Sequence, residues 1–301
     1  MITTPNVKIN LGLNILRKRE DGFHDLETLF VPYFGLHDTL EIIKGDDFSQ
    51  TSAYLFSRYG DLLHGSIAQE GVFGIETEDI SAPQIAQGIS EDGKLMITIA
   101  RKEGVDWDPL KDLTARAYYL LATDFELPSV KIFLEKTSPV GAGLGGGSAD
   151  AAFALKMLNE MFNLNLSETQ LADYASRLGS DCAFFVYNHP MTGEGRGEIL
   201  RDFDLDLSSY DLQILVPEGV SVSTAEAYGG IVPKTPEIPL RDILKRPVED
   251  WDGLLVNDFE ETVFAKHPEL AAVKHSLYES GAVYASMSGS GSALFALYRK
   301  N

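Results

Sequence analysis

The chain has 301 residues, of which 44% are hydrophobic, and its formal net charge at pH 7 is −20, from 45 acidic and 25 basic residues. A chain of this length and apolar content can bury two cores, and we find no run of residues apolar enough for a membrane span. Its acidity argues against nucleic acid as a partner, because a phosphate backbone requires a basic surface. The single cysteine, Cys182, excludes an internal disulfide and a cysteine-cluster metal site.

The amino-terminal segment alternates apolar and polar residues. After Met1–Asn6, which lacks the pattern of a signal peptide and leads us to expect a cytoplasmic protein, residues 7–15 have the period of a strand with one buried face. Lys8 and Asn10 are two positions apart and therefore project from the same face. On this segment alone, a solvated edge is as good an interpretation as a binding site. The D-G-F-H sequence at Asp21–His24 favours the site, because it predicts a turn that brings an aromatic ring and an imidazole back toward the strand.

A glycine-rich loop dominates the middle of the chain. Residues 139–152 read P-V-G-A-G-L-G-G-G-S-A-D-A-A, with five glycines in seven positions. That much bare backbone suggests positive φ values and N–H groups free to point at an anion, most simply phosphate. Ser148 suits an N-cap, and a helix from Ala149 to about Phe162 would aim the positive end of its dipole at the loop. A flexible linker would be richer in serine and would not stop so abruptly at a helix.

The loop differs from the familiar phosphate-binding patterns. No lysine follows the last glycine, as a Walker loop requires, and the following helix lacks the spacing of a dinucleotide-binding unit. Any lysine at the phosphate must therefore come from elsewhere in the chain, and Lys8 is the candidate.

The second half of the chain contains three further signals. S-E-T-Q at residues 167–170 predicts a capping box and a helix that runs to about Leu178 and stops at Gly179. Asp181 follows this stop, and from local sequence alone it would cap the next short helix. Cys182, in an apolar run, is more typical of a small buried hydrophobe than of a nucleophile. The S-G-S-G-S sequence at residues 288–292 predicts a glycine turn entering a strand or a helix.

Together these segments resemble the kinase superfamily that includes galactokinase, homoserine kinase, mevalonate kinase and phosphomevalonate kinase. The glycine loop and the closing S-G-S-G mark the superfamily. K-I-N-L with D-G-F-H-D-L-E-T-L, L-G-S-D, and G-R-G-E at Gly195–Glu198 resemble the members that phosphorylate the 2-hydroxyl of 4-diphosphocytidyl-2-C-methyl-D-erythritol in non-mevalonate isoprenoid precursor biosynthesis. The resemblance covers residues 1–43 and about 105–301.

The resemblance implies a fold, a reaction and a cofactor. The expected fold is a two-domain α+β small-molecule kinase, with an amino-terminal ATP-binding domain over residues 1–162 and a ferredoxin-like, substrate-binding carboxy-terminal domain over residues 163–301. ATP with Mg²⁺ would donate its γ-phosphoryl group to a small-molecule acceptor, with no nucleic acid or membrane partner. Neither the metal ligands nor an oligomeric state has a signal in the sequence.

Catalytic and ATP-binding residues follow position by position from the resemblance. Lys8 and Asp181 match the catalytic pair, in which the carboxylate accepts the proton of the hydroxyl or orients it, while the ammonium stabilises charge on the γ-phosphate. The glycine turn at Gly289, Ser290 and Gly291 would support the ATP loop. The loop is expected to comprise Pro139, Val140, Gly141, Ala142, Gly143, Leu144, Gly145, Gly146, Gly147, Ser148 and Ala149.

Substrate-binding residues follow in the same way. Asn10, Phe23, His24 and Tyr228 match positions that bind the cytidine-bearing substrate, and Phe23 and Tyr228 would meet across the domain cleft and stack on the cytosine. For Tyr228, an ordinary half-buried tyrosine is nearly as good an interpretation. His24 could also be a simple turn histidine.

Two segments depart from the family pattern. Residues from about 48 to 93 look like an insertion in the amino-terminal domain, and Lys111–Leu113 stand where D-N-L is common near the adenine. Two alternatives remain: another small-molecule kinase of the superfamily, for which D-G-F-H would have no purpose, and a catalytically silent nucleotide sensor, which would be expected to lose Lys8 or Asp181.

Overall fold

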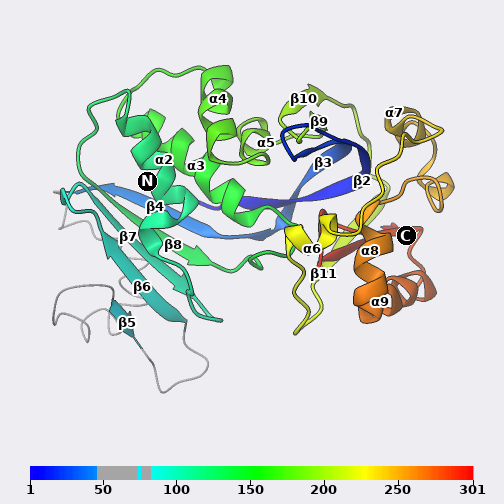
Figure 1. Ribbon diagram of the computed structural model, residues 1–301. Helices are drawn as coiled ribbons and strands as arrows, with labels where there is room; N and C mark the ends of the chain where they lie inside the picture. Colours follow the sequence, from blue (N-terminus) through cyan, green and yellow to red (C-terminus); the bar gives the residue numbers. More distant parts are fainter. Residues whose placement is uncertain (46–72, 76–82, 301) are drawn as a thin grey trace. The chain divides into compact units, whose positions relative to one another are not determined.

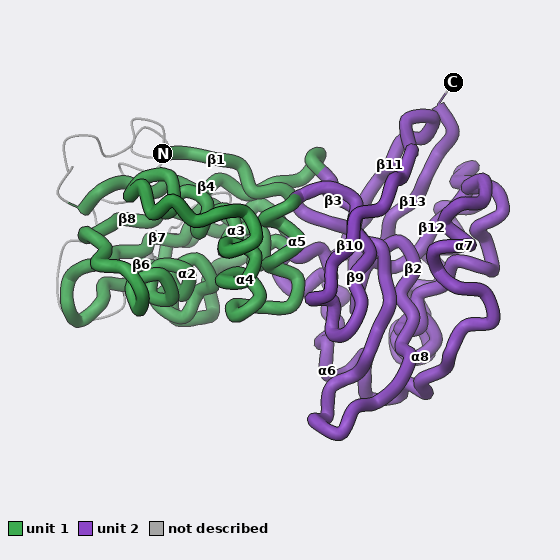
Figure 2. The backbone as a smooth tube through the Cα atoms, turned by 90° about the horizontal axis from the view of Figure 1, so that it is seen from above, with its two compact units in different colours: residues 1–6, 34–138, 146–187 green, residues 7–33, 139–145, 188–301 purple. Residues whose placement is uncertain are grey.

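The computed structural model describes residues 1–45, 73–75 and 83–300, and these residues form two compact units (Figures 1 and 2). Unit 1 takes its residues from 1–6, 34–138 and 146–187, and unit 2 from 7–33, 139–145 and 188–301. Each unit draws on both sides of residue 162, so the predicted domain boundary does not coincide with this division. Most of the segment predicted as an insertion, about residues 48–93, lies outside the described residues, because residues 46–72 and 76–82 are not described.

Unit 1 is built on a six-stranded sheet with the order β1-β4-β8-β7-β6-β5. The central strands β7 and β8 pair in parallel and the other neighbours pair antiparallel. Parallel central strands are buried on both faces, and Leu95, Ile97 and Leu134 accordingly have no exposed surface. The strands are β1 (Ile2–Thr3), β4 (Thr39–Lys44), β5 (Phe73–Ile75), β6 (Gln84–Ile89), β7 (Leu95–Arg101) and β8 (Val130–Lys136).

Helices cover one face of this sheet (Figure 1). The predicted capping box is confirmed: Ser167 and Gln170 cap each other at the start of α4, which ends before Gly179. The prediction that Ser148 is an N-cap is wrong, because the glycines continue directly into helical backbone and Ser148 lies in the first turn of α3. No helix among the described residues is long and apolar enough to cross a membrane. The elements are the 3-10 turn η2 (Pro109–Lys111), α2 (Leu113–Ala122), α3 (Gly146–Met161), α4 (Glu168–Leu178) and α5 (Cys182–Tyr187).

Unit 2 contains a four-stranded sheet, β10-β9-β3-β2, and a three-stranded sheet, β11-β13-β12. Leu13, Val263, Leu270 and Met287 belong to one buried apolar cluster that joins β2 to the helices and the smaller sheet. The strands are β2 (Asn6–Lys18), β3 (His24–His37), β9 (Met191–Gly195), β10 (Ile199–Asp202), β11 (Tyr210–Leu215), β12 (Tyr284–Met287) and β13 (Leu294–Arg299). The helical elements are α6 (Thr224–Tyr228), α7 (Leu240–Leu244), η3 (Val248–Asp250), α8 (Phe259–Lys266) and α9 (Pro268–Glu279).

The amino-terminal strand β2 is longer than predicted and is buried on both faces. Lys8 and Asn10 are each only 3% exposed, which excludes the solvated edge. The turn at Asp21–His24 is confirmed: Gly22 has φ +85°, and Arg19 N donates to Phe23 O at 2.8 Å. Buried polar side chains require partners, so Lys8 and Asn10 indicate a built site.

Candidate active site

The glycine loop has the backbone that its sequence predicts. Gly141, Gly143 and Gly145 have φ values of +74°, +78° and +73°, while Gly146 and Gly147 open helix α3. A Cβ atom at Gly143 would lie 2.1 Å from Ser288 O. No side chain fits there, and the loop therefore packs directly on the glycine turn of residues 288–292.

Lys8 reaches this loop from a distant part of the sequence. Its ammonium donates to Gly143 O at 2.8 Å and to Asn10 Oδ1 at 2.5 Å, and its backbone N–H donates to Leu144 O at 2.9 Å. Ser288 Oγ donates to the same Gly143 oxygen at 3.0 Å. Strand β2, the glycine loop and the glycine turn thus form one hydrogen-bonded cluster within unit 2.

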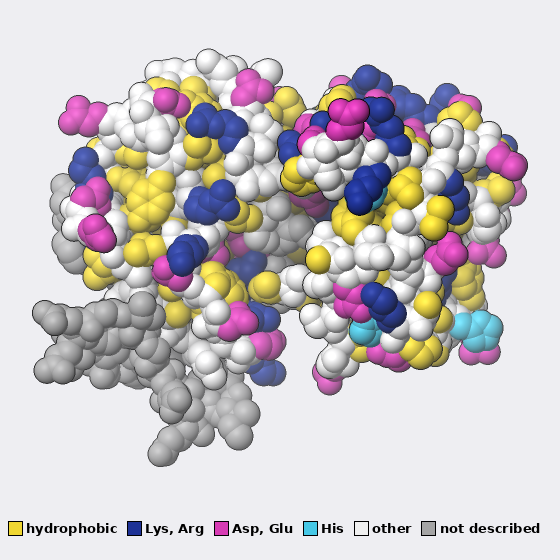
Figure 3. Space-filling model, viewed as in Figure 1, with side chains coloured by type: hydrophobic (Ala, Val, Ile, Leu, Met, Phe, Trp, Pro, Cys, Tyr) yellow, Lys and Arg dark blue, Asp and Glu magenta, His cyan; other side chains and the backbone are white. Residues whose placement is uncertain are grey.

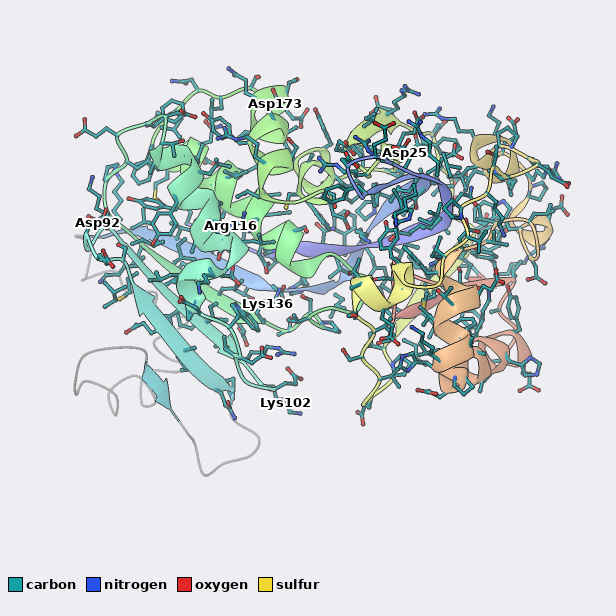
Figure 4. All side chains as sticks on the ribbon, viewed as in Figure 1. Asp25, Asp92, Lys102, Arg116, Lys136 and Asp173 are labelled. Carbon is teal, nitrogen blue, oxygen red and sulfur yellow. The ribbon has the colours of Figure 1, made fainter. Side chains whose placement is uncertain are left out.

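A buried ion-pair network lies where β8 leads into the loop, in unit 1. Lys136 Nζ contacts Asp38 at 2.5 Å and Asp150 at 2.6 Å, and Asp38 also accepts from the backbone N–H of Thr137 and of Ser138, both at 2.7 Å. Figure 4 labels Lys136 near the start of α3. The sequence analysis did not predict this network. The available signal was a charged residue in each of two largely apolar elements, Lys136 in β8 and Asp150 in α3.

The charges in this network interact strongly. Burial opposes the ammonium of Lys136, but the charges of Asp150 and Asp38 outweigh this effect and raise its pKa above the ordinary value. Burial raises the pKa of Asp150 well above its usual range, against the opposing effect of Lys136. The buried carboxyl of Asp150 is therefore easier to protonate than an ordinary aspartate.

Asp181 directly precedes helix α5 in unit 1, the unit that also contains Gly146–Ala149 at the start of α3. Ser180 Oγ donates to Asp181 Oδ1 at 3.4 Å. The neighbouring Cys182 is buried, and this burial raises the pKa of its thiol to about 12. The prediction that Cys182 is a small buried residue is confirmed, because the side chain has no exposed surface.

The substrate residues predicted near the amino terminus lie together with Tyr228 in unit 2. The rings of His24 and Tyr228 stack, with centroids 4.8 Å apart and planes at 21°. Phe23 is 53% exposed, and the guanidinium of Arg196 lies 5.1 Å from its ring centroid. These rings were expected to meet across a cleft between two domains, which is wrong: the β2–β3 hairpin pairs with β9 and belongs to the same unit as Tyr228.

The described residues contain no group of three or more His, Cys, Asp or Glu side chains that could hold a metal ion.

Acidic and basic side chains are interspersed on the face of each unit that Figure 3 shows.

Two family models match parts of the chain, and known proteins match nearly its whole length. Residues 112–189 match the GHMP kinases N terminal domain, and residues 241–301 match the GHMP kinases C terminal domain. A 4-diphosphocytidyl-2-C-methyl-D-erythritol kinase of Bacteroides fragilis is 43% identical over 298 residues, which cover 99% of this chain and 92% of that protein. The chain belongs to the GHMP kinases. The enzyme of the same name from Bacteroides thetaiotaomicron is 44% identical over 298 residues, which again cover 99% of this chain and 92% of that protein.

A solved structure agrees with this membership. The crystal structure of a 4-(cytidine 5'-diphospho)-2C-methyl-D-erythritol kinase matches this GHMP kinase with a TM-score of 0.68 at 28% identity, covering 99% of this chain and 90% of the other. The predicted two-domain α+β kinase fold and the predicted ATP-dependent phosphotransferase activity are thereby confirmed. The span aligned with the two Bacteroides relatives includes residues 48–93, the segment interpreted as an insertion.

Proposed function

We propose that this GHMP kinase transfers the γ-phosphoryl group of ATP to the 2-hydroxyl of 4-diphosphocytidyl-2-C-methyl-D-erythritol, a step of non-mevalonate isoprenoid precursor biosynthesis. The structural observation that supports this choice of substrate is the stacked pair of His24 and Tyr228. A pyrimidine base is bound by flat aromatic partners, whereas galactose, homoserine and mevalonate contain no base. The full-length similarity to relatives of this name supports the same substrate.

ATP would bind at residues 139–149. The left-handed glycines leave N–H groups that can point at phosphate oxygens, and α3 adds the positive end of its dipole. Such a site needs few cationic side chains, which suits a chain with a net charge of −20. The glycine turn at Gly289–Gly291 would hold the loop in this shape through its contact with Gly143.

Lys8 and Asp181 would carry the chemistry. The 2-hydroxyl oxygen attacks the γ-phosphorus, the bond from that phosphorus to the β–γ bridging oxygen breaks, and ADP leaves with the electron pair. Asp181 would accept the hydroxyl proton or orient the hydroxyl, and Asn10 would help to place the substrate beside Lys8. The Lys8 ammonium, fixed by Gly143 O and Asn10 Oδ1, would stabilise the charge on the transferred group.

We treat Mg²⁺ as part of the ATP complex. Mg²⁺ keeps several waters and binds chiefly through substrate phosphates, with one or two protein carboxylates rather than a dedicated cage. We further expect a cytoplasmic enzyme that acts on a small molecule and has neither nucleic acid nor membrane as a partner.

A coupled assay of ADP release tests the proposal. The purified chain with Mg·ATP is offered the cytidyl-erythritol substrate, mevalonate, phosphomevalonate, homoserine and galactose in parallel. Turnover of the cytidyl substrate alone is expected. Turnover of another acceptor would identify a different member of the superfamily, and no turnover with any acceptor would favour the nucleotide sensor.

A further inference from the structure

A buried asparagine lies behind the glycine turn and contacts both sides of it. Asn257 is 3% exposed, and its amide nitrogen donates to Met287 O and to Gly289 O, both at 2.8 Å. These two carbonyls flank Ser288. A single amide group with two N–H donors therefore fixes the backbone on either side of this serine.

Asn257 is itself held firmly to the strand that carries Lys8. Leu13 N donates to Val256 O at 2.9 Å, Asp258 N donates to Leu13 O at 2.8 Å, and Leu13 and Asn257 form a parallel bridge. The side-chain oxygen of Asn257 accepts from Phe259 N at 3.0 Å at the start of α8. The bond from Phe259 N to the side-chain oxygen sets the orientation of the Asn257 amide, so that its nitrogen faces the glycine turn.

Ser288 in turn connects the glycine turn to the cluster around Lys8. Its hydroxyl donates to Gly143 O at 3.0 Å and accepts from Asn10 N at 3.3 Å. Gly143 O is also the acceptor for Lys8 Nζ, at 2.8 Å. A displacement of Ser288 would therefore move an oxygen to which the lysine ammonium is bound.

We propose that Asn257 is a positioning residue for phosphoryl transfer, which acts through Ser288 and Gly143 on the ammonium of Lys8. The inference rests on the proposed function in giving Lys8 its role at the γ-phosphate. Small displacements of a positioned group are costly in rate, because a misplacement of about 1 Å can reduce turnover by about 10²-fold. Asn257 reaches the substrate rings of unit 2 only through Phe259, whose N–H binds the oxygen of its side chain, so a variant that keeps this oxygen leaves the support of Tyr228 in place.

The test compares steady-state kinetics of full-length variants. Asn257→Asp keeps the side-chain shape and the acceptor for Phe259 N but removes both donors to the turn. It is expected to lower kcat by about 10- to 100-fold and to leave the KM for the acceptor unchanged. Tyr284→Phe is the matched control, because it removes a buried hydrogen bond, from the tyrosine hydroxyl to Leu255 O at 2.9 Å, that involves neither Asn257 nor residues 288–292. Its kcat is expected to equal that of the wild type.

A double-mutant cycle with Ser288→Ala separates positioning from general destabilisation. If Asn257 acts through Ser288, the double variant should be no slower than the slower single variant, whereas independent structural effects would multiply. If Asn257→Asp does not fold, Ser288→Ala alone carries the test, and it is expected to show the same loss of kcat at unchanged KM.

Three results would each overturn the positioning role. The first is a double variant in which the two losses of kcat multiply. The others are a wild-type kcat in Asn257→Asp or Ser288→Ala, and a loss of kcat in Tyr284→Phe equal to that in Asn257→Asp. The cycle is measured with whichever acceptor the wild type phosphorylates. A change of substrate therefore refutes only the proposed function and not this inference.

Discussion

His24 stacks on Tyr228, and the two rings come from distant parts of the chain: one from the first residue of β3 and the other from the last residue of α6. Phe259 meets Tyr228 edge-on, with ring centroids 4.8 Å apart. The tyrosine ring is therefore held in place by aromatic neighbours. Such a rigid ring is suited to bind a base, because little side-chain entropy remains to be lost.

We expect Tyr228→Ala and Phe23→Ala to weaken binding of the cytidyl substrate by about 1–3 kcal/mol each, the range for losing one stacking partner. The KM for the cytidyl substrate should rise in steady-state assays while the KM for ATP stays unchanged. Phe34→Ala, which removes another exposed ring of strand β3, is the control and should change neither constant. A loss confined to ATP would refute the assignment of these rings to the substrate.

The pKa of His24 is lowered from its ordinary value by burial and, to a smaller extent, by the charge of Lys18. The folded protein should therefore hold a neutral imidazole below pH 6.5, where unfolded histidine is already protonated. The unfolded state binds more protons in this window, so stability from His24 is present above pH 6.5 and is lost as the pH falls through the lower, folded value. Titration of the His24 ring by NMR checks the direction, and a midpoint above 6.5 would contradict it.

Removing Lys136 should be far more damaging than neutralising Asp150. Lys136→Met leaves Asp38 and Asp150 buried without a cation and should lower the free energy of unfolding by about 3–5 kcal/mol at pH 7. Asp150→Asn should cost about 1 kcal/mol or less, because burial already raises the pKa of this carboxyl and a neutral amide suits the site. Urea unfolding at pH 7 measures both.

Mild acid should partly restore the stability of Lys136→Met, since protonation of Asp150 removes the repulsion between the two carboxylates. A loss of less than about 1 kcal/mol in Lys136→Met would show that the ion pair contributes little, and a loss of about 3–5 kcal/mol in Asp150→Asn would contradict the expectation that a neutral group suits this position.

Two glycines of the loop should respond differently to alanine. At Gly143 the new Cβ would lie 2.1 Å from Ser288 O, whereas at Gly141 it would meet no atom within 4 Å. Gly141→Ala should therefore lower the free energy of unfolding only by the cost of placing a side chain on left-handed backbone, about 1–2 kcal/mol. Gly143→Ala must also separate the loop from the glycine turn, and it should abolish ATP binding in a calorimetric titration. Wild-type ATP affinity in Gly143→Ala would remove this contact from the nucleotide site.

Asp181→Asn should lower kcat by about 10² to 10⁴-fold with little change in either KM, the range for losing a positioned proton acceptor. Lys8→Met should lower kcat at least as much. Ser180→Ala, which removes the hydroxyl that contacts Asp181, is the matched control and should stay near the wild type. If Asp181→Asn lowered the melting temperature but not kcat, the carboxylate would be a helix cap.

Local sequence determined the features that depend on neighbouring residues. The alternation of residues 7–15 predicted strand β2, the S-E-T-Q sequence predicted the reciprocal cap of α4, and the glycines predicted left-handed backbone at Gly141, Gly143 and Gly145. In each case the cause is short-range: the period of side chains along a strand, a hydrogen bond over three residues, or the missing Cβ of glycine. The motifs also identified the family and hence the reaction.

Only the tertiary structure decided which distant groups meet. Lys8 binds the carbonyl of Gly143, Lys136 pairs with Asp38 and Asp150, and Asn257 contacts the glycine turn, although no local pattern connects these residues. The same holds for the β2–β3 hairpin, which pairs with β9 in unit 2 and brings His24 rather than Phe23 onto Tyr228. Such contacts arise because buried polar groups and apolar faces must find partners when the chain packs, and that choice depends on all the packed elements together.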